Sequence, residues 1–280
     1  MGAPLYGVIG NPIGHSRSPA IHRAFAEQTD IALQYDALLA PLDGFEATVA
    51  GFRAAGGRGL NVTVPFKAQA YALCGVRTPR AERAGAVNTL IFPANPGGLV
   101  EGDNTDGAGL LADLHRLGVP LNGRRILLLG AGGATRGVLE PLLAAHPAEL
   151  FIANRSPDKA QALAQDFLAL AQPGQLRAGG FADIPPAPFD LIINATAASL
   201  AGEQLPLPRA ILTPATLAYD MAYGATPTVF LRWAESFGAQ TADGLGMLVE
   251  QAAESFWRWH SIRPETEPVL RSLRETLQSR

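Results

Sequence analysis

The sequence predicts an α/β protein with two domains. Short apolar runs that suit strands alternate with amphipathic stretches along the whole chain, which is the pattern of βαβ units around a mostly parallel sheet. A glycine-rich turn in the middle of the chain follows one such strand and opens a second series of strands and helices. With 280 residues, 48% of them hydrophobic, the chain is long and apolar enough for two folded domains.

The predicted elements follow one another in a regular order. In the first domain the strands are Leu5–Gly10, Leu33–Leu38, Leu60–Val64 and Val87–Phe92, with helices Pro19–Gln28 and Gly44–Ala55 between them. In the second domain the strands are Arg125–Leu129, Leu150–Ala153, Leu191–Asn194 and Leu217–Asp220, with helices Gly109–Leu117, Thr135–Ala145, Asp158–Leu170 and Pro227–Phe237. We expect helix Leu245–His260 to return to the first domain. Residues 1–104 and 240–280 then form one domain and residues 105–239 form the other.

Charge and cysteine content exclude several classes of protein. The formal net charge of −3 argues against a general nucleic-acid binder or a polybasic membrane binder. The single cysteine, Cys74, cannot form an intrachain disulfide, and the five histidines lack metal-ligand spacing, so we predict no metal site. We see no secretory signal and no apolar run long enough to span a bilayer, and therefore expect a soluble cytoplasmic protein.

The glycine-rich turn predicts a nucleotide site. Strand Arg125–Leu129 runs directly into Gly130-Ala131-Gly132-Gly133-Ala134 and then into a helix. Gly130 permits a tight turn, and Gly132 lets backbone N–H groups approach a pyrophosphate at the positive end of the helix. An ordinary βα turn is the alternative, because Thr135 replaces the third glycine of the full fingerprint. The strand–turn–helix context favours a Rossmann-like nucleotide-binding domain.

The end of the next strand indicates which dinucleotide is bound. It reads Asn154-Arg155-Ser156, and Lys159 follows one helical turn later. NAD sites usually place Asp or Glu here to bind the ribose hydroxyls. Arg155 can instead make a planar, bidentate contact with a 2′-phosphate, which Ser156 and Lys159 can support. Solvated basic residues are the alternative, although a helix start normally favours acids. We predict NADP in preference to NAD.

One lysine is the candidate for proton transfer. Only two of the 22 basic residues are lysines, Lys67 and Lys159. Lys67 follows a strand in which Asn61 and Thr63 share one face, and Pro65 stops that strand. The carboxyl ends of strands are where α/β enzymes bind ligands. A lysine can release a proton there, whereas an arginine cannot. An exposed lysine after a turn is the alternative.

Two further polar clusters lie where predicted strands meet loops. Ser16 and Ser18 follow the first strand and could both point at a small ligand, but taken alone the residues favour helix capping by Ser18 with Pro19 at the first helical position. Asn88 and Asp106 complete the set. Asp106 can be a helix N-cap, but an aspartate beside Lys67 would also hold its ammonium group and order the proton transfer.

Taken in order, these motifs resemble the shikimate dehydrogenase family. The resemblance extends over essentially the whole chain, through Gly14–Pro19, Asn61–Lys67, Gly102–Asp106, the Gly130 turn, Asn154–Ser156, Tyr219–Met221 and Asp243–Gln251. It implies an N-terminal substrate domain, a Rossmann-like domain, and the NADPH-dependent, reversible reduction of 3-dehydroshikimate to shikimate in aromatic amino-acid biosynthesis.

The resemblance also implies roles for individual residues. The catalytic pair would be Lys67 and Asp106. The substrate would be bound by Ser16, Ser18, Asn61, Thr63, Asn88, Asp106, Tyr223 and Gln251. The cofactor would be bound by Gly130, Ala131, Gly132, Gly133, Ala134, Asn154, Arg155, Ser156, Lys159, Met221 and Gly244.

Two segments depart from the family pattern. Ala197 and Leu200 stand where Ser and Gly are more common, which bears on contacts to the nicotinamide, and Arg77–Arg83 lacks the acidic residue expected near Thr78. Three alternatives stay open: an NAD-dependent quinate/shikimate dehydrogenase, a dehydrogenase of an aminated or methylated shikimate analogue, and a dinucleotide-binding regulator without catalysis. A monomer and a homodimer both fit the sequence.

Overall fold

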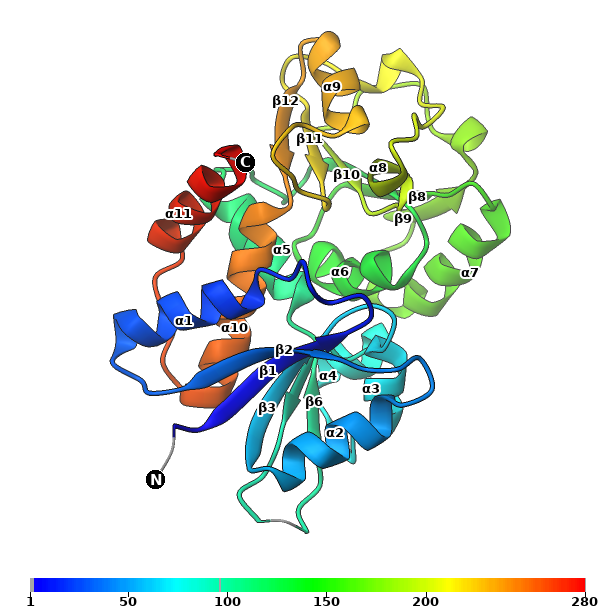
Figure 1. Ribbon diagram of the computed structural model, residues 1–280. Helices are drawn as coiled ribbons and strands as arrows, with labels where there is room; N and C mark the ends of the chain where they lie inside the picture. The colour runs from blue at the N-terminus through cyan, green and yellow to red at the C-terminus, as the bar shows by residue number, and fades with distance from the viewer. Residues whose placement is uncertain (1–2, 96, 280) are drawn as a thin grey trace. The chain divides into compact units, whose positions relative to one another are not determined.

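The chain folds into two units, each built on one sheet. The computed structural model describes residues 3–95 and 97–279 (Figure 1). The first unit comprises Met1–Gly109 and Val249–Arg271, and the second comprises Leu110–Leu248 and Ser272–Arg280. Each contains a six-stranded sheet with helices, so the predicted α/β class with two domains is confirmed. Among the described residues, no helix has both the length and the apolarity to cross a membrane.

The sheet of the first unit is mixed. Its strands lie in the order β2 (Gln34–Leu39), β1 (Leu5–Gly10), β3 (Gly57–Val62), β5 (Thr89–Ile91), β6 (Glu101–Asp103) and β4 (Val76–Arg77). β1 is parallel to β2 and β3, and β4 is parallel to β6, whereas β5 is antiparallel to both β3 and β6. Since antiparallel neighbours need no crossover helix, the short segment 92–100 can join β5 to β6. It follows that β3 and β6 run in the same direction and end at the same edge.

The helices of the first unit bury the apolar positions that the sequence pattern indicates. They are α1 (Ser18–Thr29), α2 (Phe45–Ala54), α3 (Lys67–Leu73), α4 (Pro79–Ala84) and most of α10 (Leu245–His260). Ile21 and Phe25 of α1 and Phe45 and Val49 of α2 are buried. The N-cap of α1 is Arg17, which makes no capping bond with its side chain, so the expectation that Ser18 caps this helix is wrong.

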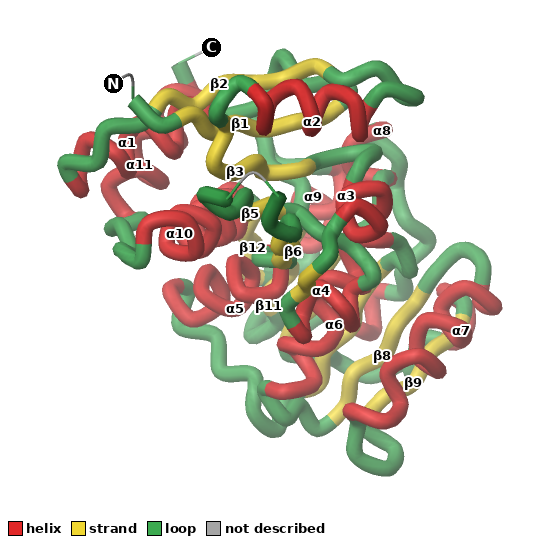
Figure 2. The backbone as a smooth tube through the Cα atoms, turned by 90° about the horizontal axis from the view of Figure 1, so that it is seen from below, coloured by secondary structure: helices red, strands yellow, loops and turns green. Residues whose placement is uncertain are grey.

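The sheet of the second unit is entirely parallel, as predicted for a Rossmann-like domain. Its strands lie in the order β12 (Gln240–Asp243), β11 (Leu217–Asp220), β10 (Leu191–Asn194), β7 (Arg125–Leu129), β8 (Glu149–Ala153) and β9 (Leu176–Gly179). The tube in Figure 2 shows β8 and β9 beside α7. Every carboxyl end in this sheet therefore points to one edge.

Helices pack on both faces of this parallel sheet. The main helices of the unit are α5 (Asp106–Arg116), α6 (Gly133–Ala144), α7 (Pro157–Phe167) and α9 (Val229–Ser236), with the short α8 (Ala198–Ala201) between the last two. In β7, Ile126 and Leu128 belong to the core that includes α6 and α7, whereas Leu127 and Leu129 belong to the core that includes α9. Side chains of a strand alternate between faces, so a four-residue apolar run is needed to fill two layers.

The boundaries between the units differ from the predicted ones. The chain passes from the first unit to the second after Gly109, inside α5, and returns to the first unit after Leu248, inside α10. A further helix, α11 (Glu267–Gln278), follows α10, and residues from Ser272 onward group with the second unit rather than with the first. Arg274 on α11 explains this, because its guanidinium donates to both carboxylate oxygens of Asp243 in β12, at 2.7 and 2.5 Å.

A histidine lies in the aromatic core of the first unit. His22 of α1 is fully buried and stacks on Tyr35, with ring centroids 4.2 Å apart and planes at 7°. Phe256 and Trp259 of α10 contact the same imidazole. Burial lowers the pKa of His22 from 6.5 to about 3, because the core cannot solvate an imidazolium.

We therefore expect His22 to make the folded chain sensitive to acid. Below pH 6.5 the unfolded chain protonates this histidine while the folded chain does not, so stability falls as pH falls and the loss continues to about pH 3. The slope is about 1.4 kcal/mol per pH unit. The variant His22→Phe should lose this slope between about pH 6 and pH 4, measured as the free energy of urea unfolding.

The control for removing a histidine is His115→Gln, because His115 is exposed on the surface. An unchanged slope in His22→Phe would mean that other groups cause the acid sensitivity.

Candidate active site and nucleotide cavity

An ion pair joins two helix starts in the first unit. The ammonium of Lys67, the first residue of α3, donates to Oδ2 of Asp106, the first residue of α5, at 2.5 Å. The other oxygen of that carboxylate accepts from Nδ2 of Asn88 at 2.8 Å. The side chain of Asp106 is 11% exposed and that of Lys67 is 30% exposed. The pair is thus mostly enclosed but still open to a small molecule.

The strand ends explain why these residues meet. Lys67 follows the end of β3, and Asp106 follows the end of β6, which runs in the same direction. The buried Phe66 precedes Lys67 in the core, and the carbonyl of Lys67 accepts the N–H of Val87 at 3.0 Å. Lys67 follows a strand as predicted, but β3 ends at Val62 rather than at Pro65, so Thr63 lies beyond the strand and does not share a strand face with Asn61.

Asp106 has a different local role from an N-cap. Its carboxylate binds Lys67 and Asn88, while its backbone N–H donates to Oδ1 of Asn104 at 3.1 Å. An asparagine that binds the backbone two residues ahead forms a local turn, and this turn begins α5. The carboxylate of Asp106 is therefore available for the ion pair.

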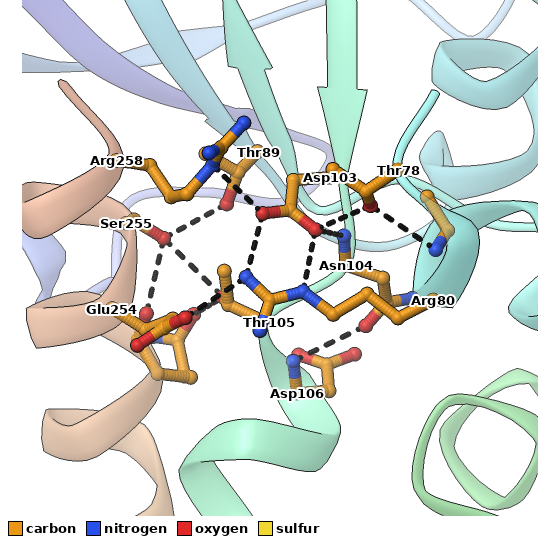
Figure 3. A network of polar contacts seen from close by, with 12 residues as sticks. Thr78, Arg80, Thr89, Asp103, Asn104, Thr105, Asp106, Glu254, Ser255 and Arg258 are labelled. Atoms are coloured by element: carbon orange, nitrogen blue, oxygen red, sulfur yellow. Dashed lines mark hydrogen bonds and ion pairs between the residues drawn. The ribbon is translucent and has the colours of Figure 1, made fainter. Parts of the chain in front are cut away.

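Buried amides and hydroxyls surround the pair and form what we call the amide–hydroxyl network. Its members are Asn61, Asn88, Thr89, Thr105, Gln251 and Ser255. Nδ2 of Asn61 donates to the Ser255 hydroxyl at 2.9 Å, and Oδ1 of Asn61 accepts from the Tyr35 hydroxyl at 2.7 Å. Figure 3 shows Ser255 bonded to both Thr89 and Thr105, with Thr105 next to Asp106. Both polar atoms of Asn61 and of Asn88 have partners inside the protein, so the network fixes the orientation of each amide.

Three further predicted substrate residues lie in the first unit, one of which, Ser18, hydrogen-bonds the Tyr35 side chain that also bonds Asn61. A fourth lies in the second unit. Ser16 and Ser18 are adjacent, because the N–H of Ser18 donates to the Ser16 hydroxyl at 3.3 Å. Thr63 follows the end of β3 and is half-buried. Tyr223 belongs to the second unit, in the segment after β11. Substrate binding by these four residues stays a prediction.

The second unit contains a cavity of about 740 Å³ at the carboxyl edge of its sheet. Seven of the predicted cofactor residues line it: Gly130, Ala131, Gly132, Asn154, Arg155, Ser156 and Lys159. The side chains of Arg155 and Lys159 are exposed and place two positive charges in the wall of the cavity. The cavity is thus suited to an anionic, elongated ligand.

Gly130 has the backbone that the predicted turn requires. Its φ of +106° lies in the region that favours glycine, and a Cβ there would come within 3.2 Å of the Ala195 carbonyl oxygen. Any other residue would strain the turn or push away the loop after β10, which lines the same cavity.

The other four predicted cofactor residues do not line this cavity. Gly133 and Ala134 form the first turn of α6, while Met221 and Gly244 follow the ends of β11 and β12. A Cβ on Gly244 would lie 2.1 Å from the Met221 carbonyl oxygen, so these two segments touch. Their contact with a cofactor stays a prediction.

The buried carboxylate of Asp220 bonds the loop 194–200, in which the sequence differs from the family pattern. Asp220 is fully buried at the end of β11 and accepts from the hydroxyls of Ser199 and Thr228, at 2.5 and 2.6 Å. Its neighbour in the sheet, Asn194, also donates to it at 3.3 Å. Ser199 thus ties α8 to the sheet beside the cavity. The side chain of Leu200 lies outside the described residues.

Sequence reasoning missed several residues of both sites. In the cavity these are Phe181, Ala201 and residues 203–206, whereas residues 195–198 belong to the loop in which the sequence differs from the family pattern. In the first unit they are Tyr35, Thr89, Thr105 and Ser255. For Thr89 and Thr105 a signal existed, since each adjoins a predicted residue, Asn88 and Asp106 respectively. Tyr35 and Ser255 are distant in sequence from the residues that they bind.

Three family models match the chain. The shikimate dehydrogenase substrate binding domain matches residues 8–90, and shikimate / quinate 5-dehydrogenase matches residues 113–201. The shikimate 5′-dehydrogenase C-terminal domain matches residues 244–274. The matches follow one another along the chain in the order that the motifs predict.

Whole-chain relatives agree with these models. A protein of Aromatoleum aromaticum named shikimate dehydrogenase (NADP(+)) is 60% identical over 274 residues, which is 97% of each chain. The protein of the same name from Cellvibrio japonicus is 55% identical over 277 residues, which is 99% of each chain.

Solved structures show the same likeness. An Ael1 enzyme from Pseudomonas putida has a TM-score of 0.90 at 46% identity, covering 97% of this chain and 98% of that one. Shikimate 5-dehydrogenase from Thermus thermophilus, solved with NADP(H) and shikimate, has a TM-score of 0.85 at 34% identity, covering 98% of this chain and 100% of that one. Since the likeness extends over both units at such identity, the chain belongs to the shikimate dehydrogenase family.

Proposed function

We propose that this chain catalyses the reversible, NADPH-dependent reduction of 3-dehydroshikimate to shikimate. The observation that carries the proposal is the ion pair of Lys67 and Asp106, aligned by Asn88 and partly open to solvent. The family and its NADP-dependent relatives support the same reaction. An amine that can gain and lose a proton, held by a carboxylate, is what carbonyl reduction and alcohol oxidation require.

Lys67 is the proton donor in this mechanism. Its ammonium has three N–H bonds, and one of them is directed to Asp106. Another is free to donate to the carbonyl oxygen of the substrate, and in the reverse direction the neutral amine accepts the proton of the hydroxyl. When bound, NADPH supplies the hydride for the carbonyl carbon. Positioned acid catalysis of this kind contributes about 10²–10⁴-fold in rate.

Asp106 and Asn88 keep this donor in place. Because one oxygen of Asp106 accepts from Lys67 and the other from Asn88, the carboxylate cannot rotate without losing a bond. Gln251, the half-buried member of the amide–hydroxyl network, offers its side-chain amide to the ring hydroxyls of the substrate, and the buried members hold it in place. Ser16 and Ser18 offer hydroxyl donors for the substrate carboxylate.

The cavity of the second unit fits the predicted cofactor. Gly130 and Gly132 line it without side chains, which leaves room for a pyrophosphate at the start of α6. Arg155, Ser156 and Lys159 provide donors and positive charge for a 2′-phosphate.

The same cavity disfavours the NAD-dependent alternative. NAD recognition calls for a carboxylate at the end of β8, where Asn154 and Arg155 stand. Among the described residues that line the cavity, the one carboxylate is Glu203, which follows α8. A regulator without catalysis is disfavoured by the intact pair of Lys67 and Asp106.

The activity itself is tested by oxidation of shikimate and of quinate, each with NADP⁺ and with NAD⁺, followed by absorbance of the reduced nicotinamide. We expect the highest kcat/KM for shikimate with NADP⁺. A higher kcat/KM for quinate with NAD⁺ would favour the first alternative, and no turnover in any combination would favour the regulator.

Replacement of Lys67 should abolish most turnover but preserve cofactor binding. We expect Lys67→Ala and Lys67→Arg both to lower kcat by about 10²–10⁴-fold, since arginine keeps the charge but cannot release the proton. The Kd for NADPH should stay unchanged, measured by fluorescence titration. Arg23→Ala, which removes an exposed cation from α1, is the matched control. Equal losses in kcat and in NADPH affinity would assign Lys67 a structural role.

Replacement of Arg155 should change the choice of cofactor. Loss of a charged hydrogen bond to phosphate costs about 1.5–3 kcal/mol, so Arg155→Ala should weaken NADPH about 10–100-fold and leave NADH nearly unchanged. The control is Arg177→Ala, whose side chain is 57% exposed in the same unit and pairs with Glu149 outside the cavity. The 2′-phosphate assignment fails if the ratio of the two affinities is the same in wild type and Arg155→Ala.

A further inference from the structure

The buried carboxylate of Asp103 lies at the end of β6, just before the turn that leads to Asp106. Asp103, the last residue of β6, is fully buried. The guanidinium of Arg80 donates to both of its oxygens, from Nε to Oδ1 and from Nη2 to Oδ2, each at 2.6 Å. The Thr78 hydroxyl donates to Oδ1 at 2.7 Å. Figure 3 shows Arg80 and Thr78 on the α4 side of this carboxylate and Arg258 on the α10 side.

The same arginine reaches a second segment of the first unit. Nη2 of Arg80 lies 2.9 Å from Oε1 of Glu254 in α10. That helix also supplies Gln251 and Ser255 to the amide–hydroxyl network. A single guanidinium thus connects the end of β6 with the helix that forms the opposite wall of the network.

Asp103 is linked through backbone groups to both Asp106 and Asn88. Its carboxylate accepts the N–H of Asn104 at 2.7 Å, and the side chain of Asn104 in turn accepts the N–H of Asp106. Its backbone carbonyl accepts the N–H of Asn88 at 3.0 Å. A shift of Asp103 therefore moves Asp106 and Asn88 relative to Lys67.

Electrostatics makes Asp103 dependent on Arg80. Burial alone would raise the pKa of this carboxyl, but the hydrogen bonds and charge of Arg80 hold the pKa below its usual value. A buried carboxylate that loses its cation becomes strongly unfavourable and must move, protonate or admit water. Arg258 at 3.1 Å is the remaining cation, and it also pairs with Glu101.

We propose that Arg80 is a positioning residue for the reaction: by clamping Asp103 and Glu254 it sets Asp106 and Asn88 around Lys67. This inference rests on the proposed function of that pair. The two carboxylate partners of Arg80 come from β6 and α10.

The first test separates kcat from cofactor binding. Arg80→Met should lower kcat for shikimate oxidation by about 10²-fold, because a small displacement of catalytic groups costs this much. The KM for NADP⁺ should stay unchanged, since the predicted cofactor residues lie in the second unit. Arg80→Lys, which keeps the charge but not the planar fork, should recover part of the loss.

The matched control is Arg263→Gln. Arg263 donates to the other oxygen of Glu254 at 2.7 Å and has no bond to Asp103 among the described contacts. The variant Arg263→Gln should therefore have the kcat of the wild type. If Arg80→Met fails to fold, Arg80→Lys and Thr78→Val carry the same test, because each weakens the hold on Asp103 in part.

The second test does not depend on turnover. The chain has two lysines, so reductive methylation with ¹³C-formaldehyde gives two side-chain signals, which Lys159→Arg assigns. The Lys67 signal should move in Arg80→Met and keep its position in Arg263→Gln. A wild-type kcat together with an unmoved Lys67 signal in Arg80→Met would overturn the inference. If wild type lacks shikimate activity while the Lys67 signal still moves, the positioning role stands and the proposed function fails.

Discussion

The ion pair between Lys67 and Asp106 constrains the rest of the first unit. Its partners are 39 residues apart, and each begins a helix just after a strand. They meet because β5 is antiparallel to both β3 and β6, which brings the carboxyl ends of those two strands to one edge. A slip of one residue in either pairing would turn the following side chains to the other face. The register of a three-residue strand, β5, is therefore a condition for the ion pair.

The polar groups behind the pair show how such a site is kept rigid. Buried amides and hydroxyls are costly unless each has a partner, and bonded networks in a low-dielectric interior reinforce one another. Here Asn88 links Asp106 to Thr105, and Ser255 links Asn61 to α10. Dipoles that are already fixed need little reorganisation when charge moves during the reaction. Asp103 and Arg80 are likewise held by partners, but as an ion pair with two hydrogen bonds rather than as neutral dipoles.

Local patterns predicted the parts of the fold that depend on periodicity. β1, β7 and α10 have the predicted bounds, because each is a long apolar run or an amphipathic repeat. β4 and β6 have two and three residues and no detectable alternation. α11 was missed although Val269, Leu273 and Leu277, all buried, recur at helical spacing. The pairing of Lys67 with Asp106 was implied by the family resemblance, since β6, whose end positions Asp106, was not predicted, and the partners of Arg80 were not predicted at all. Glu254 lies 174 residues from Arg80 in the sequence, and a local sequence pattern gives no information about a contact over that separation.

The exposed position of Arg155 and Lys159 has a consequence for how the chain would behave in different media. Both cations of the nucleotide cavity lie at the surface rather than in the core. At about 0.15 M ionic strength, dissolved ions screen such charges over roughly 8 Å. With Arg155 and Lys159 as the proposed 2′-phosphate ligands, the advantage of a doubly charged phosphate over a hydroxyl would shrink as salt rises, while contacts made by the uncharged glycine turn would persist. The preference of the protein for NADP over NAD should therefore depend on the ionic strength of the solution.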